Sequence, residues 1–248
     1  MSNKKPKILF IAPLPPPFAG PENSAKTFIE SNVKDYFEIV VFNTNYRKSN
    51  AEKGKLGLKM ISAFFILNFK LVTLLLYKRP KIVYFYVTAT ILGWIGKDIW
   101  IILLSKIFGA KVVIHMRVLH LRKNYDQTNK LFKWIIKSVI NLNSYNLAQS
   151  KSLESQYYNI VTDNSKIGYI YNMIDVKKFT KNVNELYDKD LILFLGHLSQ
   201  AKGYNDLLKV IPDVADLFPN VQFCFAGTKK SIERNILYNN MDGTKLNF

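Results

Sequence analysis

The sequence predicts an α/β protein in which strands and helices alternate to build parallel, doubly wound sheets. Short apolar runs recur along the chain, and helix-like segments separate them, which is the pattern of repeated βαβ units. The clearest unit is 191–230, where an apolar run, a glycine turn, a polar loop, a helix-like segment and a second apolar run follow one another. Hydrophobic residues make up 48% of the 248 residues, which is enough for a substantial core.

The charge is distributed unevenly, and this predicts two parts with different partners. Residues 1–180 contain 27 Lys/Arg and 10 Asp/Glu, whereas 181–248 contain eight of each, so the first part carries the whole net charge of +17. A basic surface suits nucleic acid, an anionic membrane or an anionic small substrate. Nucleic acid is the least supported of these, because the basic residues do not form an RNA- or DNA-binding motif.

The first part is expected to form one sheet with covering helices. Its predicted strands are Lys7–Ala12, Phe37–Asn43, Lys81–Val87, Lys111–Met116, Tyr145–Gln149 and Lys166–Ile170. Its predicted helices are Leu58–Tyr77, Ile91–Phe108, Lys130–Asn143, Ser150–Tyr158 and one that is capped by Asn23 or Ser24 and runs to about Val33. The proline-rich segment 13–20 can be neither helix nor central strand and is expected to be a loop, as is the polar segment 46–57.

The second part is expected to repeat this pattern on a smaller scale. Its predicted elements are the strands Leu191–Leu195 and Val221–Ala226, the helices Tyr204–Leu217 and 231–239, and one further short strand. Backbone N–H groups at a glycine turn and at a helix N-terminus favour an anion, and Lys202 in the same loop adds a positive charge. The loop after the first of these strands is therefore a predicted phosphate site.

The helix predicted at 58–77 is unusually apolar, and its polar residues lie on one narrow stripe. The stripe contains Lys59, Ser62, Lys70, Thr73 and Tyr77. Three interpretations are open: a core helix, a helix that lies on a membrane surface, and a transmembrane helix. The apolar run between charges is short for the last of these.

Nothing in the sequence calls for an oxidising compartment. Cys224 is the single cysteine and lies in an apolar run, so it is expected to be a buried, inert thiol. The apolar run Ile8–Ala12, after the basic N-terminus, is too short for the core of a signal peptide. We therefore expect a cytoplasmic protein.

Basic residues gather after the strand predicted at 111–116. His115 lies at its carboxyl end, where parallel sheets bind ligands, so it is either a hydrogen-bonded structural residue or a substrate contact. A basic loop suited to phosphate or diphosphate is expected to follow, formed by Arg117, His120, Arg122 and Lys123. The sequence contains no Walker-type loop, zinc-binding cluster or Gly-x-Ser-x-Gly elbow, and no cofactor is expected.

Segment 191–208 resembles the start of the donor domain in glycosyltransferase family 4, whose fold is called GT-B. The family pattern is a strand, Gly-Arg-Leu, about three residues, Lys-Gly, and a helix that begins near Asp-Leu-Leu. The matching positions are Gly196, His197, Leu198, Lys202, Gly203, Asp206, Leu207 and Leu208. His197 replaces the family's arginine, and histidine is charged only when protonated, so we expect diphosphate binding weaker than is usual in the family. The sequence YNMID at 171–175 resembles the Asn-Gly-Ile-Asp motif that ends the family's first domain.

The resemblance implies roles for individual residues. His115 would lie near the transferred sugar as the catalytic-site histidine, and Arg117 stands where the family's His-x-His motif has its second histidine. The implied donor-binding residues are Gly20, Gly196, His197 and Lys202, and the implied acceptor-binding residues are Arg117, Arg122 and Lys123. No metal is implied.

The resemblance also implies a domain organisation and an activity. The expected organisation is an acceptor-side domain at 1–176, a linker at 177–189 and a partial nucleotide-sugar domain at 190–248. The family's paired glutamates, which hold the donor, have no counterpart here, so we expect a chain that is truncated relative to the family. The implied activity is a retaining transfer of sugar from a nucleotide sugar to a glycan or polyprenyl-diphosphate-linked acceptor in cell-surface polysaccharide synthesis, at the inner face of the membrane. The alternative is a non-catalytic remnant or binding subunit that needs a partner for the missing donor half.

Overall fold

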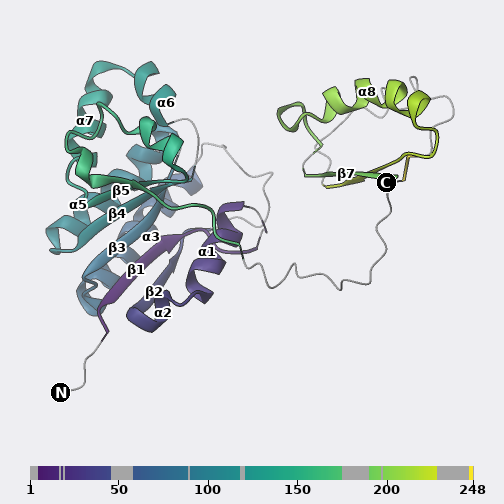
Figure 1. Ribbon diagram of the computed structural model, residues 1–248. Helices are drawn as coiled ribbons and strands as arrows, with labels where there is room; N and C mark the ends of the chain where they lie inside the picture. Colours follow the sequence, from purple (N-terminus) through teal and green to yellow (C-terminus); the bar gives the residue numbers. More distant parts are fainter. Residues whose placement is uncertain are drawn as a thin grey trace. The chain divides into compact units, whose positions relative to one another are not determined.

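The computed structural model describes residues 5–16, 18, 20–45, 58–88, 90–117, 121–174, 190–196, 198–227 and 246–247, with only the backbone described at 58–63, 201 and 246–247. The chain divides into two compact units, Met1–Phe179 and Thr180–Phe248 (Figure 1). The predicted linker 177–189, the predicted loop 46–57 and the predicted helix 231–239 lie outside the described residues.

A six-stranded parallel sheet forms the centre of the first unit. Its strands are β1 (Lys7–Ala12), β2 (Glu38–Asn43), β3 (Ile82–Val87), β4 (Lys111–Met116), β5 (Tyr145–Ala148) and β6 (Ile167–Tyr169). Their order is β2-β1-β3-β4-β5-β6, and each neighbouring pair is parallel, which confirms the predicted α/β class. The direction of winding reverses between β1 and β3, and sheets of this kind bind ligands beyond the carboxyl ends of the strands at such a switch point.

Helices cover the sheet on both faces (Figure 1). One face is covered by α1 (Gly20–Glu30), and the other by α3 (Leu58–Lys78), α5 (Ile99–Ile107) and α7 (Lys130–Ile140). Successive strand residues point to opposite faces, so Leu9 and Ile11 pack in the core of the three-helix layer, while Ile8 and Phe10 pack in the core beneath α1. Burial on both faces explains why the strands are continuous apolar runs in the sequence.

Shorter helical elements complete the first unit. They are α2 (Val33–Tyr36), α4 (Ile91–Gly93), the π-helical turn η2 (Trp94–Asp98), α6 (Leu121–Gln127) and the 3-10 helices η3 (Lys151–Gln156) and η4 (Asn164–Lys166). The helix predicted at 150–158 is present as the shorter 3-10 helix η3.

Two further predictions about the first unit are wrong. Helix α1 begins at Gly20, so Asn23 and Ser24 lie inside it and do not cap it. Pro21 fits the first turn, where a backbone N–H has no intrahelical partner to lose. The basic loop expected after β4 is in part the helix α6, which carries Arg122 on its second residue.

The burial pattern of α3 bears on the three interpretations that the sequence left open for 58–77. Leu67, Leu71 and Leu75 are buried in the sheet core, whereas Phe65 and Phe69 are exposed. None of the helices in the described ranges combines the length and the apolar character that a membrane crossing requires. The core interpretation therefore holds for one side of α3, and the exposed side leaves the membrane-surface interpretation open.

The turn after β3 is fixed by a buried carboxylate. Asp98 is fully buried, and its Oδ2 accepts hydrogen bonds from the backbone N–H of Thr88 at 2.7 Å and from the Thr88 hydroxyl at 2.6 Å. Lys97 Nζ lies 3.3 Å from Asp98 Oδ1 and also 3.3 Å from the Tyr86 carbonyl oxygen, to which it donates. These contacts hold the chain at the carboxyl end of β3.

The second unit contains the predicted βαβ unit. Its elements are β7 (Leu191–Leu195), the 3-10 helix η6 (Gln200–Lys202), α8 (Tyr204–Leu217), β8 (Gln222–Ala226) and β9 (Leu246–Asn247). The sheet has the order β7-β8-β9 with parallel pairing, and its core contains Tyr204, Ile211 and Phe223. Cys224 is a free thiol, as predicted, but it is only partly buried.

Substitutions at two neighbouring glycines test the packing of the turn after β3. A Cβ at Gly93 would lie 2.3 Å from Thr88 Oγ1, and that hydroxyl cannot rotate away without losing its bond to Asp98. Gly93→Ala is therefore expected to lower the free energy of unfolding by about 1–3 kcal/mol in urea denaturation. The matched control is Gly96→Ala, where a Cβ meets nothing within 4 Å; it is expected to raise stability by about 0.5–1 kcal/mol. Equal effects of the two substitutions would contradict this account of the turn.

Candidate functional site

A buried polar cluster lies at the carboxyl ends of β3 and β4, beneath α1. We call Ser24, Tyr86, His115 and Arg117 the switch-point cluster. Each is at most 9% exposed. The Tyr86 and His115 rings meet edge to face with centroids 5.5 Å apart, and Arg117 Cζ lies 5.0 Å from the centre of the Tyr86 ring. Residues from α1, β3 and β4 therefore converge at the switch point of the sheet.

His115 is neutral and held in one orientation. Its Nδ1 lies 2.6 Å from the hydroxyl of Tyr84. Burial raises the pKa of Tyr84, so that phenol keeps its proton. Burial, together with the nearby charge of Arg117, lowers the pKa of His115 to about 3. We assign the tautomer in which Tyr84 donates to Nδ1 and the proton is on Nε2, because it leaves fewer groups unpaired.

Arg117 brings a positive charge into this buried environment. Arg117 as a residue is 9% exposed, and the Nε and Nη1 atoms of its guanidinium have no hydrogen-bond partner in the described part of the chain. The face of the Tyr86 ring supplies a cation–π contact, which compensates only part of the cost of burying a charge. The pKa of Tyr86 is raised by burial, and this rise is partly offset by Arg117 and by the neighbouring hydroxyl of Ser24.

Several donors and acceptors of the cluster are unsatisfied. Ser24 Oγ, Tyr86 OH and His115 Nε2 are buried without a hydrogen-bond partner among the described residues; the two hydroxyls are neighbours, but their geometry does not make a hydrogen bond. Glu22, in the first turn of α1, is 5% exposed, and its Oε2 is also unpartnered. Buried polar atoms without partners are rare and point to a ligand or to strain. Hydroxyls, an imidazole N–H and a guanidinium are suited to bind sugar hydroxyls beside a phosphate.

The other predicted residues of the first unit do not join this cluster. Gly20 is the first residue of α1, and a Cβ there would meet nothing within 4 Å. Arg122 Nε donates to Asp126 Oδ2 at 2.8 Å, and its Nη1 donates to the carbonyl oxygen of Tyr158 at 2.5 Å. Lys123 is exposed on α6. Arg122 thus ties α6 to the segment after η3, and His120 lies outside the described residues.

The other three predicted donor residues, Gly196, His197 and Lys202, lie in the second unit. Gly196 directly follows β7. Gly227, which follows β8, packs so closely against it that a Cβ on Gly227 would lie 1.6 Å from the Gly196 carbonyl oxygen. Gly203 has φ +77°, a left-handed conformation that favours glycine between η6 and α8. Lys202 is exposed immediately before it. His197 lies outside the described residues.

Sequence reasoning missed Glu22, Ser24 as a site residue, Tyr84 and Tyr86. A signal was present for the tyrosines, because residues two apart on a strand face the same side. Tyr86 also pairs with His115 in the sheet register. The sequence predicts either Asn23 or Ser24 as a helix cap, and no sequence pattern marks Glu22 as buried.

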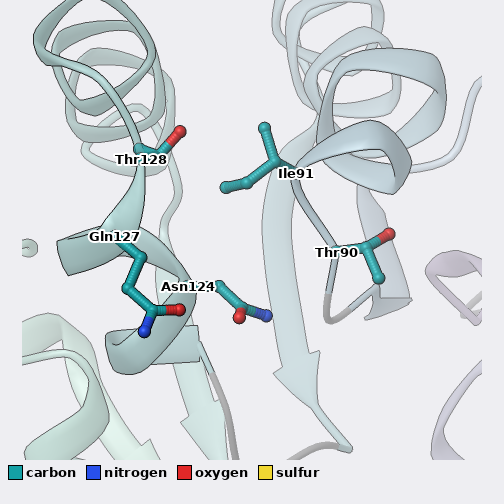
Figure 2. Close-up of a pocket in the computed structure, with 5 residues that line it drawn as sticks. All are labelled: Thr90, Ile91, Asn124, Gln127 and Thr128. Carbon is teal, nitrogen blue, oxygen red and sulfur yellow. The ribbon is translucent and has the colours of Figure 1, made fainter.

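A separate cavity of about 250 Å³ lies between the start of α4 and the end of α6 (Figure 2). It is lined by Thr90, Ile91, Asn124, Gln127 and Thr128. Figure 2 shows Thr90 and Ile91 on one side and the other three across from them. The lining is mixed polar and apolar and carries no charge, and it contains no residue that the sequence predicted for a site. Within the described ranges, no group of three His, Cys, Asp or Glu side chains could hold a metal ion.

Known proteins share the fold and little of the sequence. No protein-family model matches the chain. Spore coat protein SA of Bacillus subtilis (strain 168) is 32% identical over 79 residues, which are 26% of this chain and 21% of that protein. Anabaena Alr3699/HepE, solved with UDP and glucose, is 17% identical with a TM-score of 0.56, over 90% of this chain and 61% of that one.

Two further solved structures agree on the architecture. The catalytic domain of starch synthase IV from Arabidopsis thaliana, bound to ADP and acarbose, is 9% identical with a TM-score of 0.61, over 98% of this chain and 74% of that one. S. aureus MnaA, solved with UDP, is 12% identical with a TM-score of 0.54, over 90% of this chain and 62% of that one. The chain therefore has a GT-B-like α/β fold with Rossmann-like parallel sheets, and it spans less than two thirds of the length of HepE and MnaA.

The buried, neutral state of His115 predicts a specific dependence of stability on pH. Its pKa is about 3 in the folded state and about 6.5 when unfolded, so between these values the unfolded state binds the extra proton. Stability from this group is complete above pH 6.5 and is lost as the pH falls toward 3, by up to about 1.4 kcal/mol per pH unit. His115→Gln should therefore cost less stability at pH 5 than at pH 7.5 in urea titrations. A cost that is the same at both pH values would show that His115 does not titrate in this way.

Proposed function

We propose that this chain belongs to a glycosyltransferase of the family 4 type, which transfers a sugar from a nucleotide sugar to a glycan or lipid-linked acceptor. The observation that carries the proposal is Arg117, a buried guanidinium that lies among unpartnered hydrogen-bonding groups at the switch point of a GT-B-like fold. An anion with hydroxyl groups beside it satisfies this set better than water alone, because it supplies the opposite charge.

The second unit is the proposed donor side. The diphosphate of the nucleotide sugar would lie on the backbone N–H groups after β7 and at the start of α8, with Gly196, His197 and Lys202 as its contacts. Lys202 supplies a positive charge for the leaving diphosphate, and His197 supplies a hydrogen bond and becomes charged only when protonated.

The first unit is the proposed acceptor side. His115 Nε2–H would donate to an oxygen of the transferred sugar or of its acceptor, and its neutral state prevents it from acting as a general acid at neutral pH. Arg117 would bind a phosphate of the acceptor, and the cavity beside α6, with Asn124 and Gln127, offers hydrogen bonds to neutral sugar rings. Arg122 and Lys123 would contribute charge at the rim of the acceptor site. Gly20 would contribute to donor binding by allowing the donor to approach the backbone closely. Rate enhancement would come from positioning and charge stabilisation, without a metal or a cofactor and with retention of anomeric configuration.

The proposal includes a pathway and a place in the cell. A lipid-linked, polyprenyl-diphosphate acceptor is anionic, which suits the +17 charge that residues 1–180 carry. The enzyme would act at the cytoplasmic, inner face of the membrane in cell-surface polysaccharide synthesis. The alternative is a truncated, non-catalytic chain that binds a donor or acceptor and needs a partner for turnover.

Nucleotide binding tests the donor side. The full chain is expected to melt at a higher temperature in the presence of UDP, GDP or one of their sugars, because a ligand that binds only the folded state stabilises it. Lys202→Ala should weaken this binding roughly tenfold, since it removes one charge-assisted phosphate contact. The matched control is Lys209→Ala on α8, whose exposed Nζ lies 4.0 Å from Asp206, and it should leave the affinity unchanged. Absence of a shift with every nucleotide and nucleotide sugar would reject the proposed donor site.

Turnover tests the acceptor side and separates the two alternatives. Arg117→Gln should lower transfer to the acceptor by roughly 100-fold or more, because the charge contact that positions the acceptor phosphate is lost, while nucleotide affinity stays within about twofold. Arg79→Gln is the matched control, since Arg79 is an exposed residue between α3 and β3. A chain that binds nucleotide sugar and shows neither transfer nor hydrolysis would favour the non-catalytic alternative.

A further inference from the structure

The three helices that cover one face of the first sheet form a continuous layer. Helix α3 packs against α5, and α5 packs against α7. The rings of Phe64 on α3 and Trp100 on α5 lie 5.7 Å apart, edge to face. The inward side of the layer, which includes Leu71, Ile102 and Ile140, is fully buried against the sheet.

The outward side of this layer is also apolar. The side chains of Phe65, Phe69 and Leu76 lie opposite the buried stripe of α3, and Phe69 is 75% exposed. We define the outer helical face by its exposed apolar residues: Phe65, Phe69, Leu76, Trp100, Ile107, Leu131 and Trp134. Single exposed apolar residues are ordinary, but a concentration of large ones on adjoining helices marks an interaction surface.

The charge on the same helices has one sign. Helices α3, α5 and α7 contain seven lysines and no aspartate or glutamate. Lys70, Lys106 and Lys137 are exposed on α3, α5 and α7 respectively. A partner of this face must therefore accept large apolar side chains and carry negative charge.

We propose that the outer helical face lies on an anionic phospholipid bilayer, with its aromatic side chains at headgroup depth and its lysines on the lipid phosphates. Aromatic and aliphatic residues combined with lysine are typical of surfaces that bind membranes without crossing them. A symmetric dimer through this face would bring like charges together, and lysine is depleted in protein interfaces. The inference rests on the proposed function for its biological setting and adds which surface meets the membrane.

Vesicle binding by the full chain tests the proposal. The chain is expected to sediment with vesicles of phosphatidylcholine containing 30% phosphatidylglycerol at least about tenfold more strongly than with phosphatidylcholine alone. The double substitution Phe65→Ser and Phe69→Ser should weaken partition roughly tenfold or more, because two buried apolar side chains are lost from the interface. The control is Tyr36→Ser with Leu217→Ser, which removes two exposed apolar residues of α2 and α8, and it should bind like the wild type.

The basic residues have a matched control as well. The triple substitution Lys70→Gln, Lys106→Gln and Lys137→Gln should abolish most of the preference for anionic vesicles. The control is the same change at three exposed lysines on other elements, Lys34, Lys151 and Lys209. This control variant should keep most of the preference for anionic vesicles. Melting temperatures of all variants check that the fold is retained.

Tryptophan fluorescence reports directly on depth. The chain has three tryptophans, of which Trp134 is 68% exposed, Trp100 is 41% exposed and Trp94 is buried at 1%. Anionic vesicles should shift the emission to shorter wavelength, and brominated lipid should quench it, with both effects largely lost in Trp134→Phe with Trp100→Phe.

Three results would overturn the proposal. One is equal vesicle binding by the wild type and the Phe65/Phe69 variant, and another is emission that does not respond to lipid. The third is a wild-type chain that does not bind vesicles but dimerises, or binds single-stranded nucleic acid, through the same lysines. The nucleotide titration is independent of all three, so failure of the membrane surface and failure of the proposed donor site can be told apart.

Discussion

The structure of the first unit depends on one constraint: both faces of its parallel six-stranded sheet must be buried by helices. The two faces are covered differently, and this asymmetry places the site. Under α3, α5 and α7 the strand side chains are mostly apolar, as at Leu9, Phe85 and Ile114, and the buried Asn146 is satisfied by a hydrogen bond from Asn143. Under α1 they include Tyr86 and His115, so the unpartnered polar strand side chains of the described residues lie on the α1 face, next to the switch point.

The unpartnered polar atoms of the switch-point cluster lower the stability of the folded protein. Each buried polar atom without a partner costs about 1–3 kcal/mol when no other group pairs with it. Its two nitrogen-containing side chains have different properties. His115 is neutral and is oriented by Tyr84, whereas Arg117 supplies the positive charge. A preformed arrangement of this kind does not have to reorganise when an anionic, hydroxyl-rich ligand binds, which is the main advantage of placing such groups on strands.

Helix α3 shows how one sequence meets two demands. The sheet core requires one apolar stripe on α3, formed by Leu67, Leu71 and Leu75. This stripe accounts for only part of the apolar character of the helix. The aromatic residues on its other side have no role in that core, and they occur on a helix without acidic residues. The second unit, in contrast, has balanced charge, which is consistent with a division between a basic first unit and a neutral second one.

The sequence by itself determined the order and type of most elements, because a strand buried on both faces must be a continuous apolar run. It also located the turn at Gly196, the loop that contains Gly203 and the strand end at His115. Only the tertiary structure decided which polar groups meet, since Ser24 and Tyr86 are far apart in the sequence and are brought together by the packing of α1 on β3. It also decided that Arg122 is bonded to Asp126, because α6 formed where a loop was expected. Sequence periodicity specifies which face a residue occupies, and the neighbours across that face depend on how the elements pack.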